Sequence, residues 1–376
     1  MAIPSPVAGK SAIMTIAAQF QIEYQQFLDP LARIVAPLPA FARDPAALIP
    51  LYEAMLLMRA YDAKAIALQR TGQLGTFASL LGNEAVEAGV GAAMAPEDVL
   101  LCTYRENGVQ LMRGVRVREL FTYWGGDERG SDFSGPRHDF PICVTIASQC
   151  LHAAGVGYAI KLRRQPRVAV CMLGDGATSK GEFYEGINAA GIWRLPVVFF
   201  VTNNQWAISV PRSGQTAART LAQKALAAGF DGVQVDGNDV IAVHHGMREA
   251  LAKARSGGGP TLIEALTYRL GDHTTADDAS RYRPAEQVAE AWKNEPVLRL
   301  RNYLLETGVW SKGQEEELLR RCNEHVQAEA QAYLDAPMPP VCQIFDYLHA
   351  TLPGAYAAQR AAILGEASEH GADRAG

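Results

Sequence analysis

The chain has 376 residues, enough for one large α/β domain or two smaller ones. Hydrophobic residues make up 48% and charged residues 20% of it, the balance of an ordinary globular protein. A formal net charge of −5 and the lack of any Lys/Arg block exclude a basic surface for nucleic acid. No apolar run reaches the roughly 18 residues that a membrane-spanning helix needs, so we expect neither a nucleic-acid nor a membrane partner.

The cysteine pattern bears on the compartment. The six cysteines include no C-x-x-C pair, so a structural zinc site is not expected. Cys143 and Cys171 lie in apolar stretches and are typical of small core residues. Free thiols favour a reducing compartment, and we predict a cytoplasmic protein. The early segment SAIMTIAAQFQIEY is short and has no clear cleavage site, so we expect no secretory signal peptide.

The first half of the chain alternates between proline-rich and helical patterns. Residues 1–45 are rich in proline and alanine and predict an extended N-terminal arm. We expect a main α/β domain with C-terminal helices over 46–350, and a polar tail over 351–376. The apolar spacing in the first part of that domain predicts a helix, a small-residue helix, a buried strand and a second small-residue helix, over 48–70, 83–94, 98–103 and 148–162.

The centre of the chain has the clearest pattern. A strand over 167–173, a helix over 180–191 and an almost wholly apolar strand over 196–202 predict one βαβ unit with a right-handed crossover. The alternation continues as helix, strand, helix and strand, followed by two amphipathic helices, over 220–228, 232–235, 240–255, 261–268, 286–305 and 312–335. This order predicts an α/β fold: a doubly wound, mostly parallel sheet with helices on both faces.

A carboxylate stands in the glycine turn of the central βαβ unit. Gly174 and Gly176 would let backbone N–H groups approach a phosphate, but Asp175 between them would repel it. A cation between the two groups removes the conflict, and Mg²⁺ prefers oxygen ligands from protein, phosphate and water. The next strand ends in Asn203 and Asn204, whose amide oxygens would reach the same sheet edge. The sequence therefore predicts a magnesium and phosphate site.

Other phosphate and metal motifs fit this turn less well. A P-loop would have its lysine directly after the second glycine, whereas Lys180 precedes Gly181. A dinucleotide-binding turn would have a third glycine where Ser179 stands, and an EF-hand would have acids at Ala177 and Ser179. The simplest alternative is a strand–turn–helix in which Asp175 only caps the helix. The two asparagines after the next strand favour the metal site.

The central segment resembles a known enzyme class. GDGATSKGEFYEGINAAGIWRLPVVFFVTNNQ is similar to the thiamine-diphosphate signature, in which GDG is followed by NN. The motifs YRENG, EFYEGINAAG, NNQWAIS and GPTLIEALTYRLGDHTTADDASRYR resemble the α subunit of the E1 component of 2-oxo acid dehydrogenase complexes. The resemblance runs from about residue 50 to about residue 350, and is strongest to pyruvate dehydrogenase E1 α subunits of the bacterial α2β2 type.

This resemblance implies a thiamine diphosphate and Mg²⁺ site. The family's metal ligands correspond to the side chains of Asp175 and Asn204 and to the backbone carbonyl of Trp206. The diphosphate would be cradled by the backbone of the glycine turn at Gly174, Gly176 and Ala177 and held by Tyr104 and Arg105. Asn107 follows in the same motif, at a position that is His in some relatives, and receives no role.

Further positions of the resemblance concern the other end of the cofactor. The backbone of Val144 and Ile146 would meet the aminopyrimidine, although apolar residues before a helix are often plain core. His273, in the polar segment LGDHTTADDASRYR, would reach the diphosphate and the substrate, and would assist acyl transfer as a catalytic residue. His244, His245 and His152 are weaker candidates, because they fall within predicted helices.

The resemblance also implies partners. The cofactor would supply the decarboxylation chemistry. Enzymes of this class use two similar α/β units, and this chain has a single GDG–NN unit. The glutamate that shares a proton with the cofactor would therefore come from an E1 β subunit, in an α2β2 heterotetramer. The acyl group would pass to the lipoyl group of an E2 acyltransferase.

The expected function is oxidative decarboxylation of pyruvate with reductive acetylation of lipoyl-E2, leading to acetyl-CoA and CO₂. Branched-chain 2-oxo acid and acetoin dehydrogenases have near-identical α subunits and remain alternatives. A Rossmann-type nicotinamide oxidoreductase would need an acid at the second strand end, where 202–204 read TNN. The intact Asp175, Asn204 and His273 argue against a non-catalytic scaffold of the same fold.

Overall fold

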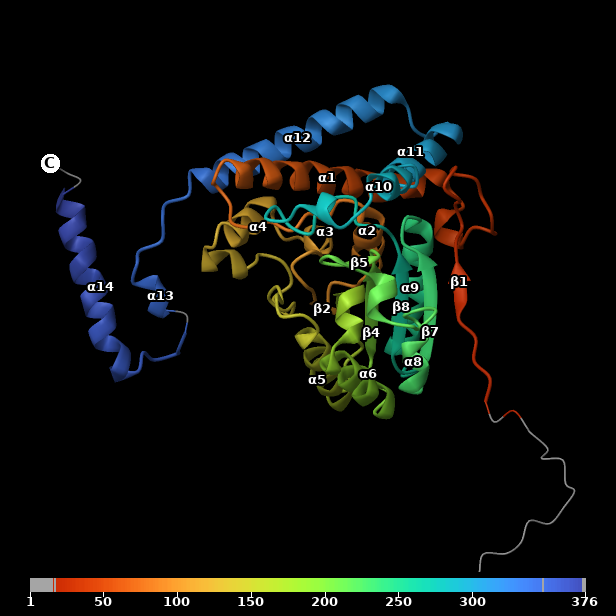
Figure 1. Ribbon diagram of the computed structural model, residues 1–376, viewed down its shortest axis with the longest axis horizontal. Coiled ribbons are helices and arrows are strands. Elements are labelled where there is room, and N and C mark those ends of the chain that lie inside the picture. Colours follow the sequence, from red (N-terminus) through yellow and green to blue (C-terminus); the bar gives the residue numbers. More distant parts are fainter. Residues whose placement is uncertain (1–15, 17, 347, 374–376) are drawn as a thin grey trace, which may run out of the picture.

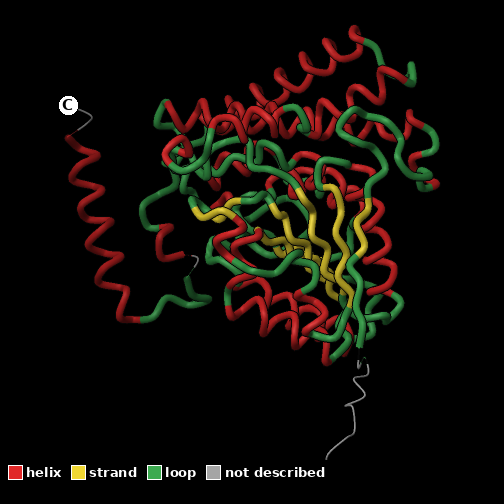
Figure 2. Tube along the Cα trace, turned by 45° about the vertical axis from the view of Figure 1, so that its right-hand side comes forward, coloured by secondary structure: helices red, strands yellow, loops and turns green. Residues whose placement is uncertain are grey.

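The computed structural model describes residues 16, 18–346 and 348–373, with side chains up to residue 365. Parts of the predicted arm (1–15 and 17) and of the predicted tail (374–376) lie outside the described residues. Figure 1 shows a central sheet flanked by helices, with the long helices α1 (Ile49–Arg70) and α12 (Lys312–Leu334) across one end. The helix α14 (Gly354–Asp373) stands apart from this body in Figures 1 and 2.

The sheet is parallel throughout. Within the described residues it has six strands in the order β1-β7-β8-β4-β3-β2, and every neighbouring pair is parallel. The strands are β1 (Glu23–Gln25), β2 (Val99–Leu101), β3 (Ala169–Gly174), β4 (Val197–Asn203), β7 (Asp231–Asp236) and β8 (Thr261–Leu266). The α/β fold predicted from the sequence is confirmed.

The strand β4 shows why helices cover both faces of the sheet. All of its residues are buried, as expected for a central parallel strand without a solvent-facing side. Its apolar side chains at odd positions pack with α5 (Ser148–Leu162) and α6 (Gly181–Ile192). Those at even positions pack with α2 (Glu84–Ala93) and α9 (Val240–Arg255). The alternation of a strand therefore places one helical layer on each face.

The register of the two central strands brings the two predicted motifs to one edge. Gly174 of β3 pairs with Thr202 of β4, so Asp175 and the asparagine pair both follow at the carboxyl edge. Asp175 begins a 3₁₀ turn over Asp175–Ser179 that leads into α6. After β4 the chain forms a short antiparallel hairpin, β5 (Trp206–Ala207) and β6 (Val210–Pro211).

Two predicted helices differ from the structure. The helix predicted over 286–305 is two helices, α10 (Ala285–Trp292) and α11 (Pro296–Glu306), because Glu295 caps the second and Pro296 has no N–H with which to continue the first. The helix predicted over 220–228 is reduced to α8, because the N–H groups of Leu221 and Ala222 donate to the Glu264 carboxylate instead. The helices not yet placed are α3 (Asn107–Met112), α4 (Val117–Trp124), α7 (Arg212–Gln215), α8 (Lys224–Ala227) and α13 (Gln343–Asp346).

The described parts of the predicted arm and tail contain more secondary structure than the sequence suggests. The predicted arm contributes β1 to the sheet edge, where Glu23–Gln25 pairs with β7. The arm is then fixed by Asp239, whose carboxylate accepts hydrogen bonds from the N–H groups of Phe27 and Leu28. The region predicted as a polar tail is helical over α14. Across the part of the chain that the structure describes, no helix is both long and apolar enough to cross a lipid bilayer.

A buried histidine in α9 should make stability depend on pH. His244 is 7% exposed, its ring lies 4.3 Å from that of Phe41, and burial together with Arg248 lowers its pKa to about 4. The unfolded chain, with an ordinary histidine pKa near 6.5, binds the proton more readily, so stability falls as pH drops from about 6.5 towards 4. We predict that His244→Phe reduces this loss, by up to about 3 kcal/mol.

Thermal unfolding of the full-length chain in its complex at pH 7.0 and 5.0 measures this effect. His325→Gln is the matched control, because its imidazole is exposed on α12 and should leave the pH dependence as in the wild type. An equal loss of stability in His244→Phe and the wild type would show that His244 is not the titrating group.

Candidate active site

A cavity of about 490 Å³ lies at the carboxyl edge of β3 and β4. Its wall comes from five parts of the chain: the end of β2 and the segment after it, the segment before α5, the turn after β3, the hairpin after β4, and the loop after β8. The lining residues are Thr103, Tyr104, Arg105, Glu106, Thr145, Ile146, Ala147, Gly174, Asp175, Gly176, Ala177, Lys180, Thr202, Asn204, Trp206, Ala207, Ile208 and His273. Open α/β sheets bind ligands at this edge, so we take this cavity as the candidate active site.

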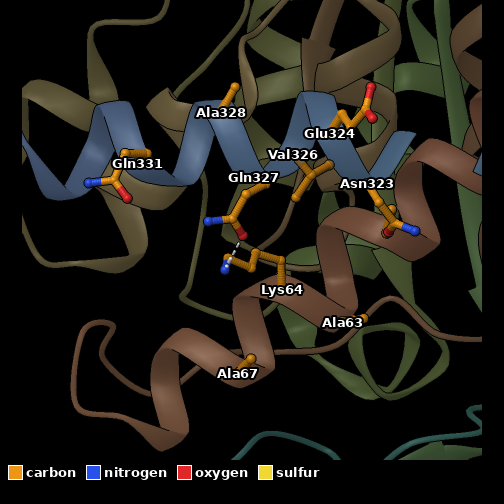
Figure 3. Close-up of a pocket in the computed structure, with 10 residues that line it drawn as sticks. Ala63, Lys64, Ala67, Asn323, Glu324, Val326, Gln327, Ala328 and Gln331 are labelled. Carbon is orange, nitrogen blue, oxygen red and sulfur yellow. Dashed lines mark hydrogen bonds between the residues drawn. The ribbon is translucent and has the colours of Figure 1, made fainter. Parts of the chain in front are cut away.

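A larger hollow of about 790 Å³ lies between α1 and α12, on a different part of the molecule. Figure 3 shows alanines of α1 facing polar side chains of α12, and Lys64 Nζ donating to Gln327 Oε1 at 2.6 Å. The charged side chains lining it are Lys64 and Glu324, and it has no histidine or cysteine. Its size alone therefore does not make it a site for chemistry.

Asp175 is the most deeply placed acid of the cavity. Its side chain is 2% exposed, and Gln215 Nε2 donates to its Oδ2 at 2.8 Å. Burial raises the pKa of Asp175, while Gln215, Arg269 and Arg105 act in the opposite direction. Gly176 must lack a side chain, because a Cβ there would lie 2.6 Å from the Cβ of Ala207 in β5. The glycine turn therefore packs directly against the hairpin that follows β4.

The two asparagines at the end of β4 point to different partners. Asn203 is 1% exposed and donates from Nδ2 to Glu264 Oε1 at 2.7 Å, so it is part of the sheet interior. Asn204 lines the cavity, and its Oδ1 accepts from the Trp206 N–H at 3.2 Å. The carbonyl of Trp206 accepts one long hydrogen bond, 3.3 Å, from Arg269 Nη1. Asn204 and Trp206 thus bring a side-chain and a main-chain oxygen to the region of Asp175.

Arg105 and His273 contact each other in the wall of the same cavity. Arg105 Nη2 donates to the His273 carbonyl at 2.9 Å and lies 3.2 Å from Nδ1, while Arg105 Nη1 donates to the Ser79 carbonyl. The Tyr104 ring lies edge-on to His273, with centroids 6.1 Å apart, and the Arg105 guanidinium lies 5.6 Å from the Tyr104 centroid. The residues of YRENG and of the polar loop therefore form one cluster.

His273 is neutral at physiological pH. Burial, then Arg105 and Arg269, lowers its pKa to about 4. Both guanidinium groups face its Nδ1, at 3.2 and 3.4 Å, and a guanidinium can only donate. We therefore assign Nδ1 as the acceptor and place the ring proton on Nε2.

The structure separates the two apolar residues predicted to meet the aminopyrimidine. Ile146 lines the cavity and is 37% exposed, whereas Val144 is 60% exposed and does not line it. The other predicted positions, Tyr104, Arg105, Gly174, Asp175, Gly176, Ala177, Asn204, Trp206 and His273, all line the cavity.

Sequence reasoning missed several residues of this region. Glu106 lines the cavity, is 4% exposed and accepts from the Thr103 N–H and hydroxyl at 2.6 Å, and burial raises its pKa. Arg269 lies in the motif TYRLGDH and Glu106 lies in the motif YRENG, so these two motifs could have indicated both residues. Gln215 stands in no such motif, and only the structure reveals its contact with Asp175.

The oxygen donors of the cavity have the chemistry that would suit a hard divalent cation. One carboxylate, one amide oxygen and one carbonyl suit Mg²⁺, which keeps its remaining positions for phosphate and water. The described residues contain no group of three His, Cys, Asp or Glu side chains placed to hold a metal. A metal at this site would therefore depend on the phosphates of a cofactor for part of its shell.

The fold and this site define an α/β protein of the thiamine-diphosphate-binding class. Residues 52–342 match the model of the dehydrogenase E1 component, and the chain belongs to that family, which depends on thiamine diphosphate. More particularly, it is an E1 α subunit of a 2-oxo acid dehydrogenase, which implies an E1 β partner. The family predicted from the motifs is thereby confirmed, and the nicotinamide oxidoreductase alternative loses its support.

Named relatives are similar over most of their length. The chain is 42% identical to the pyruvate dehydrogenase E1 component subunit alpha of Mycoplasma genitalium over 297 residues, which is 79% of this chain and 83% of the relative. It is 43% identical to the 3-methyl-2-oxobutanoate dehydrogenase subunit alpha of Mycobacterium tuberculosis over 317 residues, or 84% and 86%. A Staphylococcus aureus pyruvate dehydrogenase E1 component subunit alpha is 38% identical over 307 residues, or 81% and 83%.

Arg105 should control the charge state of His273. We predict that Arg105→Gln raises the pKa of His273, because the nearby positive charge that disfavours the imidazolium is removed while burial remains. The measurement is a ¹³C NMR titration of histidine-labelled complex, with His273→Asn to assign the signal. Arg33→Gln, on an exposed side chain, is the control. An unchanged titration in Arg105→Gln would contradict the proposed contact.

Proposed function

We propose that this chain binds thiamine diphosphate through Mg²⁺ and, together with an E1 β subunit, decarboxylates pyruvate and transfers the acetyl group to a lipoyl-bearing E2. The observation that carries the proposal is the convergence of Asp175, Asn204 and Trp206 with Arg105 and His273 around one cavity. Residues from separate motifs meet there with the oxygen donors, phosphate-binding groups and neutral imidazole that this function needs.

Asp175, Asn204 and the Trp206 carbonyl would hold the metal. The buried Asp175 has a neutral amide as its direct side-chain partner, so a cation would compensate the burial of its charge. Gly174, Gly176 and Ala177 line the same cavity, and the lack of a Cβ at Gly176 lets the turn pack against β5. These are the features that an anion bound beside a metal requires.

Arg105, Tyr104 and His273 would bind the anionic parts of cofactor and substrate. Arg105 supplies a permanent positive charge, and Tyr104 adds a hydroxyl. His273, neutral with its proton on Nε2, can donate one hydrogen bond without bringing a charge of its own. When bound, thiamine diphosphate supplies the stabilisation of negative charge that decarboxylation needs.

The β subunit and the E2 acyltransferase belong to the same proposal. The described residues form a single six-stranded parallel sheet, with one GDG–NN edge, so the second α/β unit of this enzyme class would come from another chain. We propose an α2β2 heterotetramer in which the β subunit completes the site. The lipoyl group of E2 would receive the acetyl group there.

The choice of pyruvate rests on the motifs. Relatives named for pyruvate and for 3-methyl-2-oxobutanoate are about equally similar, at 42% and 43% identity. Pyruvate is favoured because the resemblance as a whole is strongest to α subunits of the pyruvate type, whereas the loop HTTADDASRYR resembles those of pyruvate and of branched-chain enzymes alike.

The metal assignment predicts a large effect of Asp175. We expect Asp175→Ala to weaken Mg²⁺-dependent thiamine diphosphate binding to the αβ complex by at least tenfold, because the charged ligand is lost. Calorimetry at several Mg²⁺ concentrations measures it. Asp132→Ala, on an exposed loop, is the control and should bind as the wild type does. Unchanged binding in Asp175→Ala would refute the assignment.

A comparison of two 2-oxo acids tests the choice of substrate. The complex should turn over pyruvate with a kcat/KM about tenfold or more above that for 3-methyl-2-oxobutanoate, since two added methyl groups must fit a pocket of limited size. Release of CO₂ from each labelled 2-oxo acid gives the ratio. A ratio reversed in favour of the branched acid would assign the chain to the branched-chain enzymes.

A further inference from the structure

Lys224 is a buried cation that the site described above does not use. Its side chain contacts the 3₁₀ turn over Asp175–Ser179 and is 7% exposed. Among the described residues, Lys224 forms no ion pair, because no carboxylate oxygen lies within 4.0 Å of its Nζ. The ammonium instead lies 5.9 and 5.3 Å from the ring centroids of Phe183 and Tyr184. A buried ammonium without a counter-ion is costly, so its contacts need an explanation.

The ammonium binds the end of the turn that carries Asp175. Lys224 Nζ donates to the Thr178 carbonyl at 2.7 Å and to Thr178 Oγ1 at 3.0 Å. Thr178 is fully buried, and its hydroxyl donates to the main-chain carbonyl of Asp175 at 2.8 Å. A cation at the last carbonyls of a helical turn is favourable. Lys224 therefore holds the main chain at Thr178 directly, and the Thr178 hydroxyl links this contact to the carbonyl of Asp175.

Gln215 holds the side chain that the same turn presents. Its Nε2 donates to Asp175 Oδ2 at 2.8 Å, which occupies one carboxylate oxygen from the protein side. Gln215 ends α7 and Lys224 begins α8, so both contacts come from the short segment between β6 and β7. One stretch of chain thus fixes both the backbone and the carboxylate of Asp175.

We propose that Lys224 and Gln215 are positioning residues that orient Asp175 for the divalent cation. Lys224 sets the path of the turn through Thr178, and Gln215 sets the rotation of the carboxylate so that Oδ1 remains for the metal. The inference rests on the proposed function, in which Asp175 binds Mg²⁺ with thiamine diphosphate. It extends that function to residues that touch neither the metal nor the cofactor.

The test uses the full-length chain in its complex with the β subunit. Lys224→Met removes the ammonium and keeps the length of the side chain, and Gln215→Leu removes the amide. Each should raise the Mg²⁺ concentration that half-saturates thiamine diphosphate binding by about tenfold or more, as loss of an outer-shell partner does. At saturating Mg²⁺ and cofactor, kcat should return to within about twofold of the wild type. Lys224→Arg should restore part of the Mg²⁺ affinity.

Lys161→Met is the matched control. Lys161 Nζ also donates to a main-chain carbonyl, that of Trp193 at 2.5 Å, but it is exposed and remote from the turn. It should leave the Mg²⁺ requirement unchanged. If Lys224→Met does not assemble, Thr178→Val replaces it, because it removes the hydroxyl that accepts from Lys224 Nζ and donates to the Asp175 carbonyl, while the bond from Lys224 to the Thr178 main-chain carbonyl remains.

The outcomes separate the two proposals. Wild-type binding of thiamine diphosphate with an unchanged Mg²⁺ requirement in Lys224→Met, or in Thr178→Val where that variant replaces it, would overturn the inference and leave the proposed function intact. So would a loss of kcat that saturating Mg²⁺ does not restore, because it would show a role in folding or chemistry. A wild-type complex that binds no thiamine diphosphate would overturn the proposed function and the inference together.

Discussion

The buried carboxylate of Asp175 is the constraint on which the site depends. It lies at the end of a central parallel strand, out of contact with bulk water, and a neutral amide is its direct side-chain partner. A charge in such a place needs compensation from nearby positive groups. Arg105 and Arg269 lower its pKa through space, but burial still prevails and raises it. A divalent cation between Asp175 and a diphosphate would satisfy both charges at once, and the neighbouring oxygen donors suit that role.

The sheet explains how such a carboxylate can be held in place. Apolar residues of β4 alternate between the two helical layers until the strand reaches its carboxyl edge, where polar residues follow. Asn203 remains in the interior and donates to Glu264 of β8. The other oxygen of Glu264 accepts the N–H groups of Leu221 and Ala222. A buried acid of the sheet therefore anchors the segment that carries Lys224 and, through it, the turn of Asp175.

The sequence predicts those features that depend on residues close together along the chain. The boundaries of α5 and α9 agree with the apolar pattern, and the GDG and NN motifs could be placed at one edge because parallel strands end together. The contacts of Gln215 and Lys224 could not be predicted, since these two residues carry no motif and lie about 40 positions along the chain from their partners in the glycine turn. The shortened helix α8 has the same cause: Glu264, a distant residue, takes the N–H groups that a longer helix would have used.

The carboxylates that line the cavity bear on which catalytic group the β subunit would have to supply. Two carboxylates line it, Asp175 and Glu106. Glu106 is occupied by the N–H and hydroxyl of Thr103, and burial raises its pKa, so it is a structural acid of the segment that presents Arg105. Asp175 is directed to the metal in the proposed function. Neither is free to exchange a proton with the ring of a cofactor. This supports the proposal that the proton-sharing glutamate belongs to the β subunit.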